Sequence, residues 1–197
     1  MAEMESDSLL DSFGDGRRIA VERAASELRA GRPVAVGESG SCVLAFSIEG
    51  LDDERLASLL NRNPRLVVPR QKVGPAYGWR SASAAVYLKP FTLETAEAFL
   101  AYNPDSAPHA YSVEILEPSK CEAAALALSS LAFLLPAVAI ADLTAAELAR
   151  LPLLSVDSDD ILAFRDLSAS SVEIVTRTAV PLEGAVDSEF VVFRGGD

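Results

Sequence analysis

The chain has 197 residues, of which 50% are hydrophobic, and it carries 17 Lys and Arg against 29 Asp and Glu, for a formal net charge of −12. A chain of this length and apolar content can bury a core as one domain, with or without a short appendage. The negative charge repels a phosphate backbone and therefore argues against a nucleic-acid partner.

The N-terminal segment MAEMESDSLLDSFGDG is acidic. It has neither the cationic start and apolar run of a secretory signal nor the composition of a transit peptide, so we expect a cytoplasmic protein with no membrane partner. The two cysteines, Cys42 and Cys121, are too few for a disulfide framework or a zinc ligand set. We expect both to be ordinary buried thiols.

The first half of the chain alternates helical and strand-like segments. Apolar positions from Arg17 to Ala30 recur at helical spacing, and Gly31 suits the left-handed position that follows a helix end. The pattern then predicts strands at 33–36, 42–48, 65–69 and 84–89, and helices at 51–61 and 92–102. The turn GESGS joins the first two strands.

Two segments of this half are predicted to be loops. The segment 71–83 contains Gly, Pro and Ser without periodicity, and its aromatic residues Tyr77 and Trp79 either stack on a ligand or pin the loop to the core. We favour the second alternative. The loop 103–110 holds the only histidine, His109, and no sequence neighbour suggests a catalytic partner for it.

The second half repeats the alternation. Ser119 and Glu122 form an S-x-x-E capping box for an apolar helix at 121–135, which is too short and too often interrupted by polar residues to span a bilayer. A second capping box lies at 144–147. Strands are predicted at 111–117, 136–143, 153–157, 171–180 and 189–196, and a further helix at 158–167. Such alternation is typical of a layered α/β or α+β domain.

Three segments carry a family resemblance: LLDSFG (9–14) with AVERAASELRAGRPVAV (20–36), KCEAAALALSSLAFLLPAVAIADL (120–143), and LPLLSVDSDDILAFR (151–165). They resemble 3,4-dihydroxy-2-butanone 4-phosphate synthase, a riboflavin-pathway enzyme that acts on ribulose 5-phosphate. The first is similar to the opening of that family, and the other two are similar to a later helix and strand and to its closing segment. The resemblance implies an α+β fold, a mixed sheet with helices packed on it, for residues 1–168.

The C-terminal run VEIVTRTAVPLEGAVDSEFVVFRGGD (172–197) resembles instead the first strands of GTP cyclohydrolase II. The resemblance implies that residues 169–197 begin a second domain, whose zinc-binding cysteines and GTP-binding segments would come after Asp197. We therefore expect either the N-terminal domain of a longer riboflavin-pathway polypeptide or a protein that has lost its second half.

In the synthase family, the strand corresponding to residues 33–36 runs into an acidic motif whose carboxylates hold Mg²⁺ and move protons. This chain has GESGSC (37–42) there, with one carboxylate, Glu38. By the same resemblance, Lys120 stands at the position of the metal-binding histidine, where a cation repels Mg²⁺. We therefore expect neither a metal nor a cofactor, and no catalytic residue.

Two more acidic residues match family positions. Glu122 is retained, and Asp142 stands where the family has a glutamate. Both also have a structural explanation: Glu122 closes the capping box with Ser119, and Asp142 caps or flanks the helix that begins after Thr144. Weak ligand-binding remnants are thus Glu38, Lys120, Glu122 and Asp142.

These expectations favour a non-catalytic structural or regulatory N-terminal domain of a riboflavin-biosynthesis protein related to GTP cyclohydrolase II. The family resemblance also implies a homodimer and a cyclohydrolase domain on the same or a partner chain. One alternative is a divergent enzyme that uses Lys120, Glu122 and Asp142 on a sugar phosphate or nucleotide. Another alternative is a small-molecule sensing module.

Overall fold

The computed structural model describes residues 16–38, 40–101, 111–185 and 187–195. The chain forms two compact units, Met1–Ile161 and Leu162–Asp197, which we call unit 1 and unit 2. The expected boundary after residue 168 and the observed boundary after residue 161 both fall within helix α8 (Ser158–Ser170). His109 lies outside the described residues.

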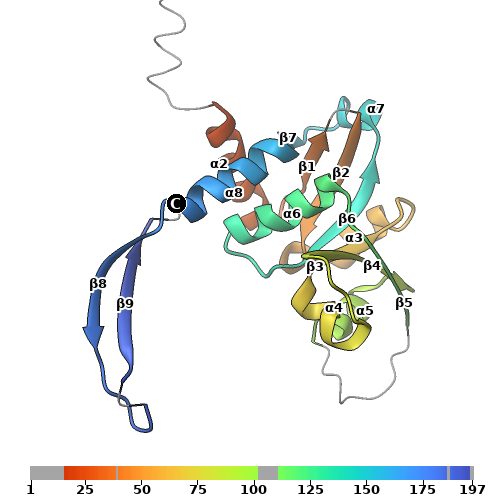
Figure 1. Cartoon of the computed structure of the whole chain (residues 1–197). Coiled ribbons are helices and arrows are strands. Elements are labelled where there is room, and N and C mark those ends of the chain that lie inside the picture. Colours follow the sequence, from red (N-terminus) through yellow and green to blue (C-terminus); the bar gives the residue numbers. More distant parts are fainter. Residues whose placement is uncertain (1–15, 39, 102–110, 186, 196–197) are drawn as a thin grey trace, which may run out of the picture. The chain divides into compact units, whose positions relative to one another are not determined.

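Unit 1 alternates strands with helices along most of its length (Figure 1). Its first elements are α2 (Gly16–Arg29), β1 (Val34–Glu38), β2 (Ser41–Ser47), the 3-10 turn η1 (Ile48–Gly50), α3 (Asp53–Leu59), β3 (Arg65–Pro69) and α4 (Arg70–Tyr77). They are followed by β4 (Ser83–Lys89), α5 (Leu93–Leu100), β5 (Ser112–Leu116), α6 (Lys120–Leu131), β6 (Val138–Leu143), α7 (Ala145–Leu148), β7 (Leu154–Asp157) and the start of α8.

The seven strands of unit 1 form one sheet in the order β5-β4-β3-β6-β2-β1-β7. All neighbours are antiparallel except β1 and β7, which are parallel. The turn GESGS joins β1 to β2 as a hairpin, with Glu38 opposite Ser41. The α+β prediction, a mixed sheet with packed helices, is therefore confirmed.

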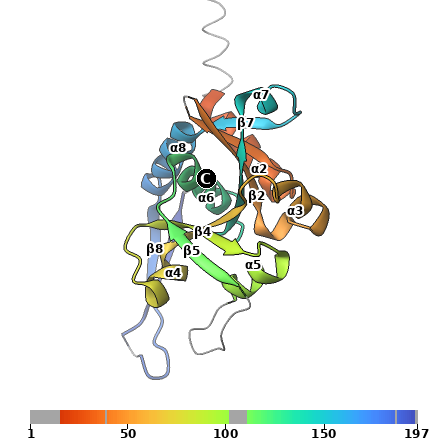
Figure 2. The same cartoon turned by 90° about the vertical axis from the view of Figure 1, so that its right-hand side faces the viewer.

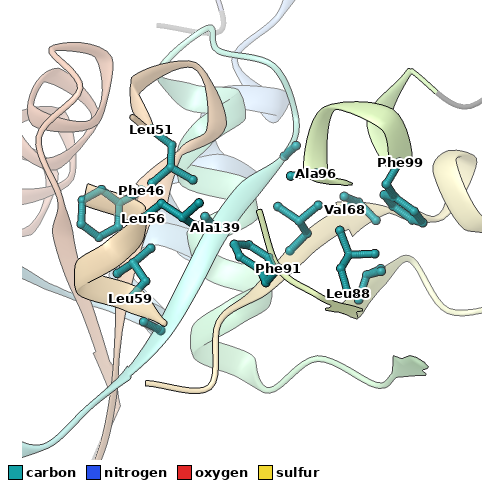
Figure 3. Packing of buried hydrophobic residues seen from close by; sticks show 14 of the residues in the cluster. Phe46, Leu51, Leu56, Leu59, Val68, Leu88, Phe91, Ala96, Phe99 and Ala139 are labelled. Atoms are coloured by element: carbon teal, nitrogen blue, oxygen red, sulfur yellow. The ribbon is translucent and has the colours of Figure 1, made fainter. Parts of the chain in front are cut away.

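Helices cover both faces of this sheet. Helices α2 and α6 contact each other and the strands β1 and β2, and Figures 1 and 2 show them lying together against the sheet. Helices α3 and α5 pack on a separate apolar cluster with alternate residues of the strands (Figure 3). Figure 3 labels, among others, Leu56 and Leu59 of α3, Phe99 of α5, and Phe46 and Val68 of the sheet. Successive side chains of a strand point to opposite faces, so each central strand is apolar on both sides.

Several helix ends follow the sequence signals. Gly31 has a φ of +72° directly after α2, as predicted, and the amide of Arg32 donates to the carbonyl of Glu27. Both predicted capping boxes are present, at Ser119 for α6 and at Thr144 for α7. The start of α6 is thus fixed by residues adjacent in sequence.

The predicted loop at 71–83 is wrong in its first part, because residues 70–77 form the helix α4. Val73 of this helix is fully buried in the apolar cluster, and this packing outweighs the low helix propensity of the segment. Trp79 packs against the same cluster and donates from Nε1 to the carbonyl of Ser83 at 2.8 Å, whereas Tyr77 is exposed. The core-pinning alternative therefore describes Trp79.

Helix α6 ends at Leu131, four residues before the predicted end at 135. Phe133 adopts a φ of +56°, and the amides of Phe133 and Leu134 donate to the carbonyls of Ser130 and Ser129. This closing turn normally uses glycine, because a side chain is disfavoured at positive φ. The sequence SLAFLLP contains no glycine, so it gives no local signal for the end of α6.

Unit 2 contains the rest of α8 and a two-stranded sheet of β8 (Glu173–Ala179) and β9 (Glu189–Arg194). The two strands pair antiparallel, with an irregularity between Ile174 and Thr176. Large apolar side chains, including Phe190 and Phe193, are exposed on them. Within the part of the chain that the structure describes, no helix is long and apolar enough to cross a membrane.

Candidate functional site

Charged side chains gather at one end of the sheet in unit 1. The strand β1 ends there with Glu38, Asp142 is the last residue but one of β6, and β3 begins there with Arg65. Helix α6 begins at the same place with Lys120 and Glu122. All four residues predicted as remnants therefore meet at this end, which we call the charged end.

The ammonium group of Lys120 bridges two carboxylates. Its Nζ lies 2.9 Å from Oε1 of Glu38 and 2.8 Å from Oδ1 of Asp159, the second residue of α8. The hydrogen bonds to Asp159 and Glu38 raise the pKa of Lys120 well above its usual range. A cation in the first turn of a helix is disfavoured by the helix dipole, so these two carboxylates offset an unfavourable position.

Arg65 bridges the other two acidic residues. Its Nε donates to Oε1 of Glu122, and its Nη1 donates to Oδ1 of Asp142 at 2.8 Å and to the carbonyl of Asn63 at 2.9 Å. Arg65 and Glu122 are only 5% and 4% exposed. Burial opposes the charged form of Arg65, but the hydrogen bonds and charges of Glu122 and Asp142 outweigh it and raise the pKa of the guanidinium.

Two further contacts hold this arrangement together. Oε2 of Glu122 accepts from the amide of Ser119 at 2.6 Å, so one carboxylate serves both the capping box and the ion pair. The guanidinium carbon of Arg65 lies 5.7 Å from the centre of the Tyr87 ring, within the range of a cation–π contact. Buried charges persist when they are paired and hydrogen-bonded, as both are here.

Asp142 flanks α7 but does not cap it, so the capping alternative is wrong. Thr144 is the N-cap, and its side chain accepts from the amide of Glu147. Asp142 instead pairs with Arg65 and accepts from Nδ2 of Asn63 at 3.4 Å. It lies in β6, where the strand register and not the next helix decides the direction of its side chain.

Sequence reasoning missed Arg65 and Asp159. The one available signal for Arg65 was its position as a charged residue at the start of the apolar run RLVVP. The signal for Asp159 was the acidic pair of Asp159 and Asp160 in the first turn of the last predicted helix. Neither signal names a partner. Their ion pairs follow from the order of the strands and from the position of α6, which the local pattern does not contain.

A cavity of about 330 Å³ lies beside Glu38, lined by residues 37–38 and 40–42, helix α7 and the end of β7. Cys42 lines it, whereas Cys121 is buried with its Sγ 3.7 Å from Oγ of Ser41. Burial raises the pKa of both thiols, which keeps them protonated and unreactive near neutral pH. No group of three metal-ligating side chains occurs in the described residues.

Solved structures of 3,4-dihydroxy-2-butanone 4-phosphate synthases share this fold. The chain matches a two-domain 3,4-dihydroxy-2-butanone 4-phosphate synthase from A. baumannii with a TM-score of 0.56 and 16% identity, over 89% of this chain and 66% of that one. The chain has the 3,4-dihydroxy-2-butanone 4-phosphate synthase fold. A structure of such a synthase with two magnesium ions matches with a TM-score of 0.53 and 15% identity, over 76% of this chain and 97% of that one.

The curated relatives that match the sequence are GTP cyclohydrolase-2 proteins. The chain is 29% identical over 194 residues to the GTP cyclohydrolase-2 of Xylella fastidiosa and 31% identical over 191 residues to that of Azospirillum brasilense. These matches take in 93% and 89% of the chain but 47% and 50% of the relatives, so the chain spans about half their length. No family model matches the sequence. The predicted resemblance to a synthase-like domain of the kind joined to GTP cyclohydrolase II is confirmed.

Proposed function

We propose that unit 1 is a non-catalytic structural or regulatory domain of a riboflavin-biosynthesis protein related to GTP cyclohydrolase II. One observation carries the proposal: every carboxylate matched to the synthase family is held by a basic side chain of the chain itself. Lys120 holds Glu38, and Arg65 holds both Glu122 and Asp142.

The chemistry of the synthase family explains why this pairing matters. Enolising and rearranging a ketose phosphate needs a hard Lewis acid on the substrate oxygens and carboxylates that accept protons. One carboxylate oxygen of Glu122 accepts a hydrogen bond from Arg65, and the other accepts one from the amide of Ser119. At the other pair, the ammonium of Lys120 opposes any divalent cation near Glu38. The residues present therefore do not fit a magnesium-dependent reaction.

A direct assay tests this proposal. We expect the purified chain, incubated with ribulose 5-phosphate and Mg²⁺, to release no formate above a control without enzyme, while an active synthase under the same conditions releases it. Turnover that is abolished in a folded Glu122→Gln variant would refute the proposal. That result would support the divergent enzyme instead, with Glu122 as the group that moves the proton.

The cavity beside Glu38 supports a second candidate, a module that binds a small molecule. Its volume of about 330 Å³ lies within the range of ligand pockets, and its wall includes Ser41, Cys42 and Asp157. Thermal melting with ribulose 5-phosphate or GTP as the probe distinguishes the two candidates. A concentration-dependent rise in Tm favours the sensing module, and an unchanged Tm favours the structural domain.

We also propose two partners for unit 1, a cyclohydrolase domain and a second copy of the chain. Because the chain spans about half of its GTP cyclohydrolase-2 relatives, we propose a cyclohydrolase domain on the same or a partner chain, with unit 2 at its beginning. We also propose a homodimer with a closed two-fold interface, the assembly that the synthase resemblance implies.

A further inference from the structure

A second cavity, of about 460 Å³, lies at the end of the sheet opposite the charged end. Strand β2 begins at the charged end and finishes at Ser47, which pairs with Val138. Ile48 and Ala137, the residues next to this last pair, line the cavity, and the amide of Ile48 donates to the carbonyl of Ala137 at 3.4 Å. This cavity shares no residue with the one beside Glu38.

Most of the cavity wall is apolar. Its apolar residues come from η1, from the end of α5 and from the segment between α6 and β6: Ile48, Leu100, Ala101, Leu135, Pro136 and Ala137. Leu135 is 57% exposed, so a large apolar side chain of this wall is in contact with water. A ligand with an apolar body would cover such surface, which is favourable in proportion to the area covered.

Three charged side chains complete the wall: Glu49, Lys72 and Glu97. Lys72 forms no ion pair with either carboxylate, and its Nζ donates instead to the carbonyl of Leu100, the last residue of α5, at 2.6 Å. Oε1 of Glu49 accepts from the amide of Leu135 at 3.3 Å. Within the part of the chain that the structure describes, the carboxylate of Glu97 forms no ion pair.

The charges around the cavity favour a cation. Two carboxylates face one ammonium, and that ammonium already donates to a carbonyl. The C-terminal end of α5 also lines the cavity, and the helix dipole places partial negative charge there. A phosphate ester such as ribulose 5-phosphate or GTP would be repelled by both carboxylates. The preferred ligand chemistry therefore differs from that of the synthase family.

We propose that this cavity binds a small organic cation, an amine or guanidine joined to an aromatic or aliphatic body. The body packs against Leu100, Leu135 and Pro136. The cationic group lies beside the carboxylates of Glu97 and Glu49. The bound molecule thereby connects α5 with η1 and with the segment that leads into β6.

Three indole compounds test the role of charge, because they share one ring system: tryptamine is a cation, indole is neutral and indole-3-acetate is an anion. Each is titrated into the unmodified chain by calorimetry at neutral pH. We expect tryptamine to bind about tenfold or more tightly than indole-3-acetate, with indole between them, because the charge of the cavity attracts one and repels the other. In amide NMR spectra, tryptamine should shift the signals of Leu135 and Ala137.

Two variants and one matched control assign the site. Glu97→Gln should weaken tryptamine binding by about threefold or more, the size typical of a partly exposed ion pair. Glu94→Gln, on the same helix but outside the cavity, should leave the affinity unchanged. Ala101→Trp, at an exposed position of the wall, fills the cavity and should abolish binding in a chain that circular dichroism shows to be folded.

Three outcomes overturn the proposal. They are tryptamine that does not bind at millimolar concentration, indole-3-acetate that binds as tightly as tryptamine, and tryptamine binding that neither Glu97→Gln nor folded Ala101→Trp weakens. None of these outcomes bears on the formate assay or on thermal melting with ribulose 5-phosphate and GTP, which test the residues matched to the synthase family. Formate release by the unmodified chain would likewise leave the tryptamine titrations unaffected.

Discussion

Arg65 offers the sharpest test of how the charged end is stabilised. Replacing it with methionine keeps an unbranched stem of similar length but removes the guanidinium. The carboxylate of Glu122, 4% exposed, then loses its buried counter-charge, while the mostly exposed Asp142 regains water. Removing one partner of a buried ion pair costs about 3–5 kcal/mol, because the other charge stays behind in a poorly solvated place.

This cost is large for a domain whose total stability is on the order of 5–15 kcal/mol. For a chain of this length, each kcal/mol lowers the Tm by about 2–4 °C, so Arg65→Met should melt about 6–20 °C below the unmodified chain. Urea unfolding followed by far-UV circular dichroism gives the free energy of unfolding directly. The matched control is Arg18→Met, which removes an exposed arginine paired with Glu22 and should change that free energy by less than about 0.5 kcal/mol.

The double variant Arg65→Met with Glu122→Gln completes the cycle. Glutamine can still accept from the amide of Ser119, and no buried charge is left without a partner. We therefore expect the double variant to be more stable than the sum of the two single losses predicts. A loss below about 1 kcal/mol for Arg65→Met, or strictly additive losses, would refute the view that a buried ion pair holds α6 to the sheet.

Four further predictions concern other parts of the chain. Hydrogen bonds from the backbone and side chain of Thr144, with help from Arg62, lower the pKa of Glu147 from 4.5 to about 2, so the stability it contributes is complete above pH 4.5 and is lost as the pH falls toward 2. Glu147→Gln should flatten the unfolding free energy over that range in urea titrations at several pH values, and an unchanged pH profile would contradict the assignment. Ser119→Ala should cost about 1 kcal/mol through loss of the α6 cap, measured by urea unfolding, while Ser130→Ala, which removes a side chain that caps no helix, should stay within about 0.5 kcal/mol. Light scattering at micromolar concentration should give twice the chain mass of 20.9 kDa, and a single-chain mass would count against the homodimer. In hydrogen-exchange measurements, the amides of β8 and β9 should exchange faster than those of the seven-stranded sheet, because an isolated hairpin is marginally stable. Pairing of these strands with another strand in the dimer would slow their exchange. Strong protection of both strands in a demonstrated monomer would contradict the prediction.

The sequence determined those features of this protein that depend on residues close together in the chain. The capping box of α6 needs only Ser119 and Glu122, three residues apart, and the end of α2 needs only Gly31. The strand at 65–69 was predicted with the bounds that the structure gives, because a short apolar run with β-branched residues is informative by itself. The family resemblance then supplied the fold that these elements build.

The tertiary structure decided the features that depend on distant neighbours. The segment 70–77 is helical despite its low helix propensity because burial of Val73 in the core stabilises the helix. Phe133 follows the end of α6 with a positive φ, a conformation that its residue type disfavours. Arg65 and Glu122 are 57 residues apart in the chain, and Lys120 and Glu38 are 82 apart. No local pattern pairs such residues. Their ion pairs exist because the strand order brings the ends of β1, β3 and β6 together under the first turn of α6, and electrostatic attraction is strong only at that short range.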